Sequence, residues 1–345
     1  MDEQPIEPRR SDARDRRPTM ADVAARAGVS RALVSLVFRG QPGAGPATRE
    51  RVVQAAHELG YRPDTAARLL ARGRSRTLGV LLTVHQPFHA DLVEAIYPAA
   101  EQAGYEVLLS ASAPVRDERK SVEALLSHRC EGLILLGPQS DTRWLDELGR
   151  RTVTAVVGRR LPGVHVDSVH TAEAHGIRQA VDHLVELGHR AIAHIDGGKA
   201  PASADRRRAY RTAMRKHGLT EHVDILPGDH TEDAGIEAGR ALLTREQLPT
   251  AVLAGNDRCA VGLIRTLLRA GVDVPREVSV IGYDDSHIAH VANDLTTVRQ
   301  DALRMGEQAV RSAVRRLEDD ALAPEEIIVE PKLVVRGTSG PPPDR

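Results

Sequence analysis

From Thr77 onward, short apolar runs alternate with longer segments in which apolar residues recur every three or four positions. The first pattern is typical of buried strands and the second of amphipathic helices. An alternation that continues to the end of the chain predicts parallel sheets covered by helices on both faces, and its length favours two lobes. The predicted strands are Leu78–Leu82, Glu106–Leu109, Gly132–Leu136, Val153–Val157, Ala191–Ile195, Ala251–Leu253 and Val278–Ile281, and the helical segments include Leu92–Ala103, Ala172–Leu187 and Arg258–Ala270.

Residues 19–60 follow a different pattern, which predicts three short helices. Thr19 and Asp22 have the spacing of a capping box at the start of the first helix. Gly28 permits a sharp turn, and a second helix over Arg31–Phe38 keeps its apolar side toward the first. Two short helices joined by a glycine-containing turn predict a helix-turn-helix unit.

The outer side of the second helix carries small and polar residues that suit contact with DNA. Arg31 can donate two hydrogen bonds to guanine, and Ala32 and Leu36 can cover thymine methyl groups in the major groove. Phosphate contacts, which fix the register without reading sequence, are expected from four other polar residues. These are Ser30, Ser35, Thr48 and Arg49.

Charge is distributed unevenly along the chain. Residues 18–76 contain ten arginines and four acidic residues, a formal charge of +6 in a chain whose total is −1. The first 17 residues balance five arginines against five acids and contain almost nothing apolar, so we expect them to be disordered. Residues 77–345 therefore carry about −7, and a basic head on an acidic body indicates that the head meets a polyanion.

The run Thr19-Met-Ala-Asp-Val-Ala-Ala-Arg-Ala-Gly-Val-Ser30, followed by Val34-Ser35, resembles the signature of the lactose-repressor and galactose-repressor (LacI/GalR) family. The similarity continues through Thr48-Arg49-x-x-Val52 and Leu59-Gly-Tyr-x-Pro63, and it covers nearly all of residues 18–339. One departure is the loop Arg39–Pro46, which is richer in glycine and proline than is usual in the family.

The resemblance implies a hinge helix after Pro63 that folds when two subunits lie side by side on the operator. Ala67 and Leu70 would belong to that helix, with Leu70 as an apolar wedge that kinks the DNA at the minor groove. The full set of predicted DNA contacts is Thr19, Ser30, Arg31, Ala32, Ser35, Leu36, Thr48, Arg49, Ala67 and Leu70.

The same resemblance implies an effector domain similar to periplasmic sugar-binding proteins, with a small polar effector, a sugar or similar metabolite, bound between two lobes. Arg206 and Asp284 match positions that often hold effector, and an arginine opposite a carboxylate is suited to hydroxyl groups. Aromatic residues make up only 2% of the chain, which leaves few platforms for stacking a sugar ring. The predicted effector contacts are Phe88, His89, Arg159, Arg206, Asn256, Asp257 and Asp284.

Two other classes of protein fit the sequence less well. A secreted solute-binding protein would need an apolar leader, which the polar first 17 residues do not provide. An enzyme is disfavoured because the chain has no HExxH or GxSxG motif, and Gly197-Gly-Lys199 is followed by Ala200 where a phosphate loop needs a hydroxyl. Cys130 and Cys259 are isolated, so we expect neither a disulfide nor a metal site.

The sequence thus predicts a small all-α helix-turn-helix head and an α/β, two-lobed effector domain with doubly wound parallel sheets. Its predicted function is that of a homodimeric, cytoplasmic repressor that binds pseudo-palindromic operator DNA under effector control, without catalysis, cofactor, metal or membrane contact. The expected segments are a tail at 1–17, a head at 18–62, a hinge at 63–76, an effector domain at 77–339 and a tail at 340–345. We assign about 77–170 and 300–335 to the first lobe and 171–299 to the second.

Overall fold

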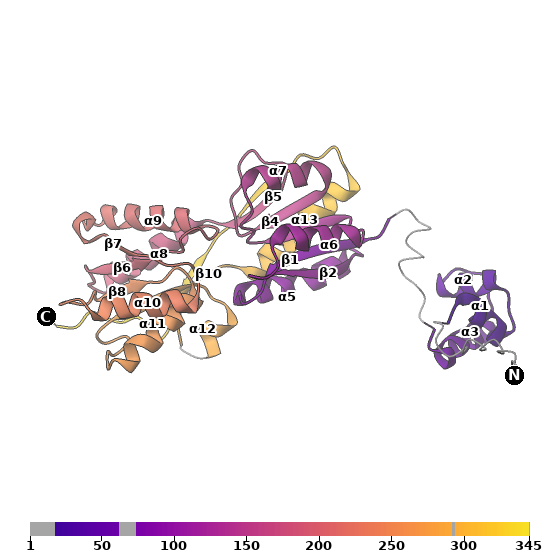
Figure 1. Ribbon diagram of the computed structural model, residues 1–345, viewed down its shortest axis with the longest axis horizontal. Coiled ribbons are helices and arrows are strands. Elements are labelled where there is room, and N and C mark those ends of the chain that lie inside the picture. Colours follow the sequence, from indigo (N-terminus) through magenta and orange to yellow (C-terminus); the bar gives the residue numbers. More distant parts are fainter. Residues whose placement is uncertain (1–17, 62–73, 292–293, 345) are drawn as a thin grey trace, which may run out of the picture. The chain divides into compact units, whose positions relative to one another are not determined.

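The computed structural model describes residues 18–61, 74–291 and 294–344, and the chain divides into two compact units, Met1–Ser75 and Arg76–Arg345. The first unit is a helical head and the second is a two-lobed α/β domain with parallel sheets, which confirms the predicted fold class (Figure 1). Most of the predicted hinge, including Ala67 and Leu70, lies outside the described residues. Within those residues, no helix combines the length and the apolar character needed to cross a bilayer.

Three helices make up the head: α1 (Met20–Ala27), α2 (Arg31–Phe38) and α3 (Pro46–Leu59). Gly28 follows α1 with a φ of 66°, a left-handed conformation that glycine adopts without a steric penalty. Val23, Val34 and Val52, one from each helix, are fully buried at the centre. Each such side chain contributes about 1.5–3 kcal/mol by its removal from water, so the apolar face of α2 orients the whole helix.

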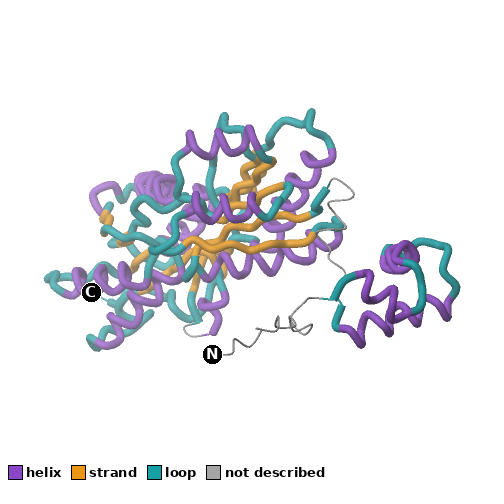
Figure 2. Tube along the Cα trace, turned by 45° about the vertical axis from the view of Figure 1, so that its right-hand side comes forward, coloured by secondary structure: helices purple, strands orange, loops and turns teal. Residues whose placement is uncertain are grey.

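The first lobe is a six-stranded parallel sheet in the order β11-β5-β4-β3-β1-β2. Alternate residues of β3 point to opposite faces: Ile134 packs with α5 and α13, and Leu135 packs with α6 and α7. Helices flank the strands on both sides (Figure 2). Burial on both faces explains why its central strands are continuous apolar runs. The elements are β1 (Thr77–Thr83), α5 (Pro87–Gln102), β2 (Glu106–Ser112), α6 (Glu118–Ser127), β3 (Gly132–Leu136), α7 (Thr142–Arg151), β4 (Val153–Val157), β5 (Asp167–Thr171), α13 (Ala302–Glu318) and β11 (Glu326–Val329).

The second lobe repeats this design with the order β12-β10-β9-β8-β6-β7, in which only β12 is antiparallel to its neighbour. Helices α8 and α9 cover one face of its sheet, and α10 and α11 cover the other. The elements are α8 (Glu173–Glu186), β6 (Ile192–Ile195), α9 (Ser203–Lys216), the 3-10 helix η1 (Thr220–His222), β7 (Asp224–Leu226), α10 (Glu232–Leu243), β8 (Ala251–Leu253), α11 (Asp257–Arg269), β9 (Ser279–Asp284), α12 (His287–Val291), β10 (Thr296–Arg299) and β12 (Lys332–Val334).

The chain passes between the lobes three times, after β5, after β10 and after β11. The sequence assigned residues 300–335 to the first lobe, whereas β12 joins the sheet of the second. Strands β11 and β12 are only four and three residues long and are separated by Glu330 and Pro331, so no periodic pattern marks the passage. The three connections lie at the same end of the two sheets. The strands that lead into them therefore end beside the space between the lobes.

Candidate functional site

The N-terminal end of α2 presents the predicted DNA-reading residues on its outer side. Ser30 caps the helix, its hydroxyl accepting a hydrogen bond from the Leu33 amide at 3.2 Å. Arg31 and Ala32 are exposed, and the Arg31 guanidinium makes no hydrogen bond or ion pair with any described residue. Ser35 and Leu36, one turn further on, are partly exposed on the same side. An unpaired arginine at this end of an outward-facing helix is free to contact a base edge.

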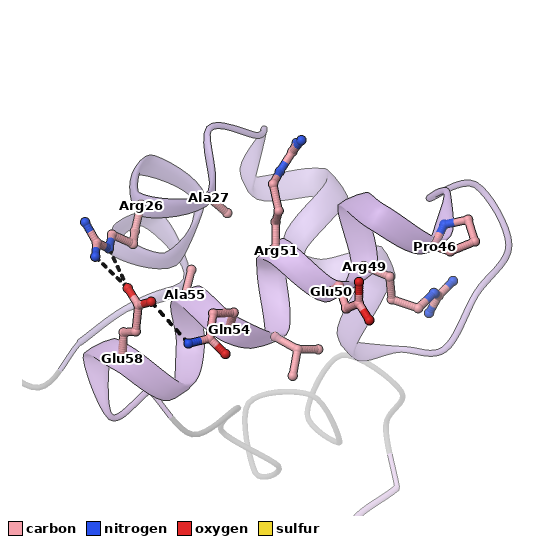
Figure 3. Close-up of a pocket in the computed structure, with 10 residues that line it drawn as sticks. Arg26, Ala27, Pro46, Arg49, Glu50, Arg51, Gln54, Ala55 and Glu58 are labelled. Atoms are coloured by element: carbon pink, nitrogen blue, oxygen red, sulfur yellow. Dashed lines mark hydrogen bonds and ion pairs between the residues drawn. The ribbon is translucent and has the colours of Figure 1, made fainter.

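Polar contacts hold α1 and α3 in place around this helix. The Asp22 carboxylate accepts hydrogen bonds from the amide and the hydroxyl of Thr19, both at 2.7 Å, at the start of α1. Arg26 forms an ion pair with Glu58 at 2.6 Å, which links α1 to α3 (Figure 3). The pair is exposed and screened by solvent, so the buried valines, not this pair, stabilise the head.

The glycine-rich loop after α2 packs back onto the helix. Gly43 has a φ of 127°, and a Cβ atom built on it would lie 3.1 Å from the Leu36 side chain. Arg49 donates to the Gln41 carbonyl at 2.9 Å and the Val37 carbonyl at 3.4 Å, which ties α3 to the loop. The guanidinium of Arg49 is thus engaged with backbone, and Thr48 beside it is partly exposed.

Between the two lobes, at the carboxyl ends of the strands, is a cavity of about 90 Å³. We call it the cleft. Its walls come from the first turns of α5, the loops after β3 and β4, and several loops of the second lobe. Five of the seven predicted effector contacts line it: Phe88, His89, Arg206, Asn256 and Asp284.

Arg206 is buried and already paired. Its Nε atom donates to Glu173 at 2.8 Å, its Nη1 atom donates to the Gly255 carbonyl at 2.7 Å, and its guanidinium lies 3.6 Å from the centre of the Tyr283 ring. Burial lowers the pKa of Arg206, but Glu173, Tyr283 and Asp284 together outweigh it, and the net shift is upward. Asp284, at 3.9 Å, is only a secondary partner. The arginine therefore remains charged, and its charge is balanced within the protein.

Asp284 ends a chain of hydrogen bonds that reaches two of the passages between the lobes. Its Oδ1 atom accepts from the Gln300 amide at 2.7 Å, and the Gln300 carbonyl oxygen accepts from the Thr171 hydroxyl at 2.6 Å. Thr171 ends β5 and Gln300 follows β10. Burial raises the pKa of Asp284 to about 7, against the opposing effect of Arg206. The cleft wall is thus joined directly to the segments that connect the lobes.

Two histidines of the cleft are neutral. The Thr83 amide donates to His89 Nδ1 at 3.0 Å, so the proton of the neutral ring is on Nε2. Burial lowers the pKa of His89 to about 4 and that of His230 to about 3. Around pH 7 each ring therefore offers one donor and one acceptor and no charge.

Two predicted effector contacts, Arg159 and Asp257, do not line the cleft. Arg159 donates to the carbonyl oxygens of Ser140 at 2.6 Å and Pro138 at 3.1 Å and so holds the loop after β3. Asp257 is fully buried and accepts from the Ser286 amide at 2.8 Å. Sequence reasoning also missed Glu173, His230 and Gln300, for which no motif gave a signal.

Within the described residues, no group of three or more histidines, cysteines or carboxylates is placed to hold a metal ion. The model for bacterial regulatory proteins of the lacI family matches residues 19–64, and the model for the periplasmic binding protein-like domain matches residues 181–339. The HTH-type transcriptional regulator CelR of Thermobifida fusca is 35% identical, over 94% of this chain and 98% of its own length.

Solved structures show the same similarity. A LacI transcriptional regulator from a Rhodococcus species is 46% identical over 77% of this chain and 98% of its own, with a TM-score of 0.74. The lac repressor dimer bound to operator and the anti-inducer ONPF is 27% identical over 94% of this chain and 100% of its own, with a TM-score of 0.79. A CelR–cellobiose complex is 33% identical over 93% of this chain and 100% of its own, with a TM-score of 0.68.

Proposed function

This chain belongs to the LacI family of bacterial regulatory proteins, and we propose that it is a homodimeric repressor controlled by an uncharged, hydroxyl-rich small molecule. Members of this family are DNA-binding transcription regulators, so the chain regulates transcription and is not an enzyme. The observation that carries the DNA-binding part of the proposal is the exposed Arg31 at the start of α2, which pairs with no described residue. We place the protein in the cytoplasm, where the operator DNA is.

In the proposed complex, α2 enters the major groove with its N-terminal end against the bases. Arg31 contacts guanine through two parallel hydrogen bonds, and Ala32 and Leu36 cover thymine methyl groups. Two subunits place two such helices on the half-sites of a pseudo-palindrome, one helical turn of DNA or a multiple of it apart. The remaining contacts go to phosphates and set the register, from Thr19, Ser30, Ser35, Thr48 and Arg49.

The hinge completes the proposed interface. Ala67 and Leu70 of both subunits enter the central minor groove, where the Leu70 side chains separate two base pairs and kink the duplex. The family resemblance implies that the hinge folds only on DNA and beside the partner hinge, because a short isolated helix is marginal in water. This dependence lets the effector domain control DNA affinity through the spacing of the two hinges.

The charges of the cleft point to an uncharged effector. Among the described residues that line it, the one cationic side chain is Arg206, whose charge is balanced by Glu173 at 2.8 Å. His89 and His230 are neutral around pH 7, and the remaining ionisable groups of the lining are carboxylic acids. An anion would enter the cleft without a counter-charge, at a large desolvation cost. Hydroxyl groups, by contrast, find donors on the imidazoles and acceptors on carboxylates and amides.

Transmission of the signal follows from the chain of hydrogen bonds between Asp284, Gln300 and Thr171. A ligand hydroxyl that bonds to Asp284 competes with Gln300 for the carboxylate, and Gln300 is itself bonded to Thr171 at the end of β5. Both segments pass between the lobes, so a change in these bonds changes the angle between the lobes. We propose that this angle sets the separation of the two hinges.

Selection of random duplex DNA by the full-length protein, with binding then measured over a series of salt concentrations, tests the DNA-binding part. We expect a palindrome with a flexible pyrimidine-purine step at its centre and an affinity that falls steeply with salt. Arg31→Ala should abolish enrichment at one position of each half-site. Arg269→Ala, which removes an exposed arginine of the effector domain, is the matched control and should leave the selected sequence unchanged. Equal binding to all sequences by the unmodified protein would contradict the proposal.

A thermal-shift screen tests the effector part separately. We expect stabilisation by one or more neutral sugars, with cellobiose among those screened, and none by the phosphate esters or acid forms of the same sugars. Stabilisation by a sugar acid at saturating concentration, without any by its neutral parent, would refute the argument from charge.

A further inference from the structure

A groove outside the cleft separates helices α8 and α9, which lie side by side on the second lobe (Figure 1). Its volume is about 570 Å³, and it extends to Ile328 of β11 at the edge of the first sheet. We call it the outer groove. Alanines 172, 174, 209 and 213 lie along it, and its cationic residues are Arg160, Arg178, Arg208 and Lys216.

Two contacts fix how the helices face each other across the outer groove. Glu173, at the start of α8, pairs with Arg206 near the start of α9, and Asp182 pairs with His217 just after α9. The helices therefore run parallel, and Arg178, midway between Glu173 and Asp182, is level with Thr212. Arg208, Thr212 and Lys216 recur every four residues and so share one side of α9. Three cations and a hydroxyl consequently converge on the same stretch of the groove.

Two of these four cations lack a carboxylate partner among the described residues, whereas Arg160 pairs with Glu326 at 2.8 Å. Arg178 and Lys216 have no carboxylate within ion-pair distance in the described part of the chain. Arg208 reaches only Asp205, at 3.4 Å, across an exposed surface. Like charges facing each other destabilise a pair of helices, so the fold gains nothing from this arrangement. A bound anion would remove the repulsion.

The N-terminus of α8 also borders the outer groove, where Glu173 in its first turn offsets part of its positive charge. Its first turn lines the outer groove, and its N-cap residue, Ala172, supplies no side-chain hydrogen bond to the free amides. The N-terminal end of a helix carries a partial positive charge and attracts anions.

We propose that the outer groove is a second ligand site, which binds a small phosphorylated molecule. Phosphate oxygens accept hydrogen bonds from the guanidinium of Arg178, the ammonium of Lys216 and the hydroxyl of Thr212. The uncharged part of the ligand lies along the alanines and against Ile328, whose side chain is 53% exposed. The volume is within the range of small-molecule sites, about 300–1,000 Å³.

The site is chemically opposite to the cleft and separated from it by one ion pair. Glu173 lines the outer groove, and its partner Arg206 lines the cleft. The cleft excludes anions because its cation is already balanced, whereas the outer groove has cations without partners. The two sites can therefore bind different ligands at the same time.

Calorimetric titration of the full-length protein with pyrophosphate, at an ionic strength held constant with sodium chloride, tests the proposal. We expect saturable binding by the unmodified protein and at least tenfold weaker binding by Arg178→Gln/Lys216→Gln. The matched control is Arg211→Gln/Arg269→Gln, which removes two exposed arginines outside the groove and should change the affinity less than twofold. Restoring a cation with Arg178→Gln/Lys216→Arg should recover part of the affinity.

Three results would overturn the proposal. The first is the absence of saturable pyrophosphate binding by the unmodified protein. The second is an equal loss of affinity in the two double variants, which would indicate a general effect of net charge. The third is binding of a hexaglutamate peptide in place of pyrophosphate, which would make the groove a docking surface for an acidic protein segment. None of these results depends on the identity of the operator or of the cleft ligand.

Discussion

Replacing Glu173 by glutamine tests the central electrostatic feature of the effector domain. The substitution keeps the shape of the side chain and removes the charge that balances Arg206, which is only 5% exposed. Removal of one partner of a buried ion pair costs about 3–5 kcal/mol, because a buried charge is left unbalanced. The Gly255 carbonyl and the Tyr283 ring still contact the guanidinium, and Asp284 is 3.9 Å away. We therefore expect a loss near the lower limit, about 3 kcal/mol.

The loss should depend on pH in a defined direction. The folded-state pKa of Asp284, about 7, is above its ordinary value of 3.8, so ionisation of this carboxyl reduces the stability of the protein as pH rises between those values. Burial is the main cause, and the charge of Glu173 adds to it. Without Glu173, Asp284 becomes the counter-ion of Arg206 and its pKa falls. The penalty of Glu173→Gln should consequently be larger at pH 5.5 than at pH 8.

Guanidinium chloride unfolding, followed by far-ultraviolet circular dichroism at both pH values, measures this loss of unfolding free energy. Glu237→Gln is the control, because Glu237 pairs with Arg240 at 2.6 Å while both side chains are about two-thirds exposed. Exposed pairs contribute little, so the control should change the free energy of unfolding by about 0.5 kcal/mol or less. A loss below about 1 kcal/mol for Glu173→Gln at both pH values, or a larger loss at pH 8, would refute the assignment of Arg206 to Glu173.

Three further predictions concern different parts of the molecule. Arg31→Ala should cost about 1–3 kcal/mol of operator affinity and relax the preference at one base pair of each half-site, measured by competition between operator variants. An equal loss of affinity on every sequence would mean that Arg31 contacts phosphate and not a base. Burial lowers the pKa of His194 to about 4, so the stability that the neutral ring contributes is complete above pH 6.5 and is lost as pH falls toward 4. His194→Gln should therefore flatten the fall in unfolding free energy between pH 7 and 5. An unchanged slope would mean that other groups cause the loss of stability in acid. Gly235→Ala should lower the midpoint of thermal unfolding by several degrees, because the added Cβ would lie 2.0 Å from the Cys259 carbonyl oxygen where α10 crosses α11; an unchanged midpoint would contradict this close approach.

Sequence patterns predicted the mostly apolar strands and missed the strands that are very short or mostly polar. β3 reads Gly-Leu-Ile-Leu-Leu and is buried on both faces, so its residues alone define it. β5 reads Asp-Ser-Val-His-Thr and is equally buried. Its Asp167 is fully buried and accepts hydrogen bonds from the Glu325 amide and from Arg316, both at 3.0 Å. A buried carboxylate satisfied by residues some 150 positions away leaves no local pattern that could predict the strand.

The residues of the candidate site were likewise only partly predictable from the sequence. The rule that ligands bind beyond the carboxyl ends of parallel strands placed Asp284 and Asn256 beside the cleft from sequence alone. Glu173 had a local explanation, because an acid in the first turn of a helix interacts favourably with the helix dipole. Its partner Arg206 is 33 residues away on another helix, and only the packing of α8 on α9 brings the two together. Which charges face each other is a property of the packed lobes and cannot be predicted from spacing.

The size of the cleft bears on how an effector controls this protein. A cavity of about 90 Å³ is well below the roughly 300 Å³ at which small-molecule pockets begin, so a sugar can enter only if the lobes move apart. That movement must stretch the bonds between Asp284, Gln300 and Thr171, because these residues connect the cleft wall to the passages between the lobes. Part of the binding energy is therefore used to change the angle between the lobes. A ligand shifts such an equilibrium only by its difference in affinity for the two states, and operator DNA must in turn change effector affinity by the same factor.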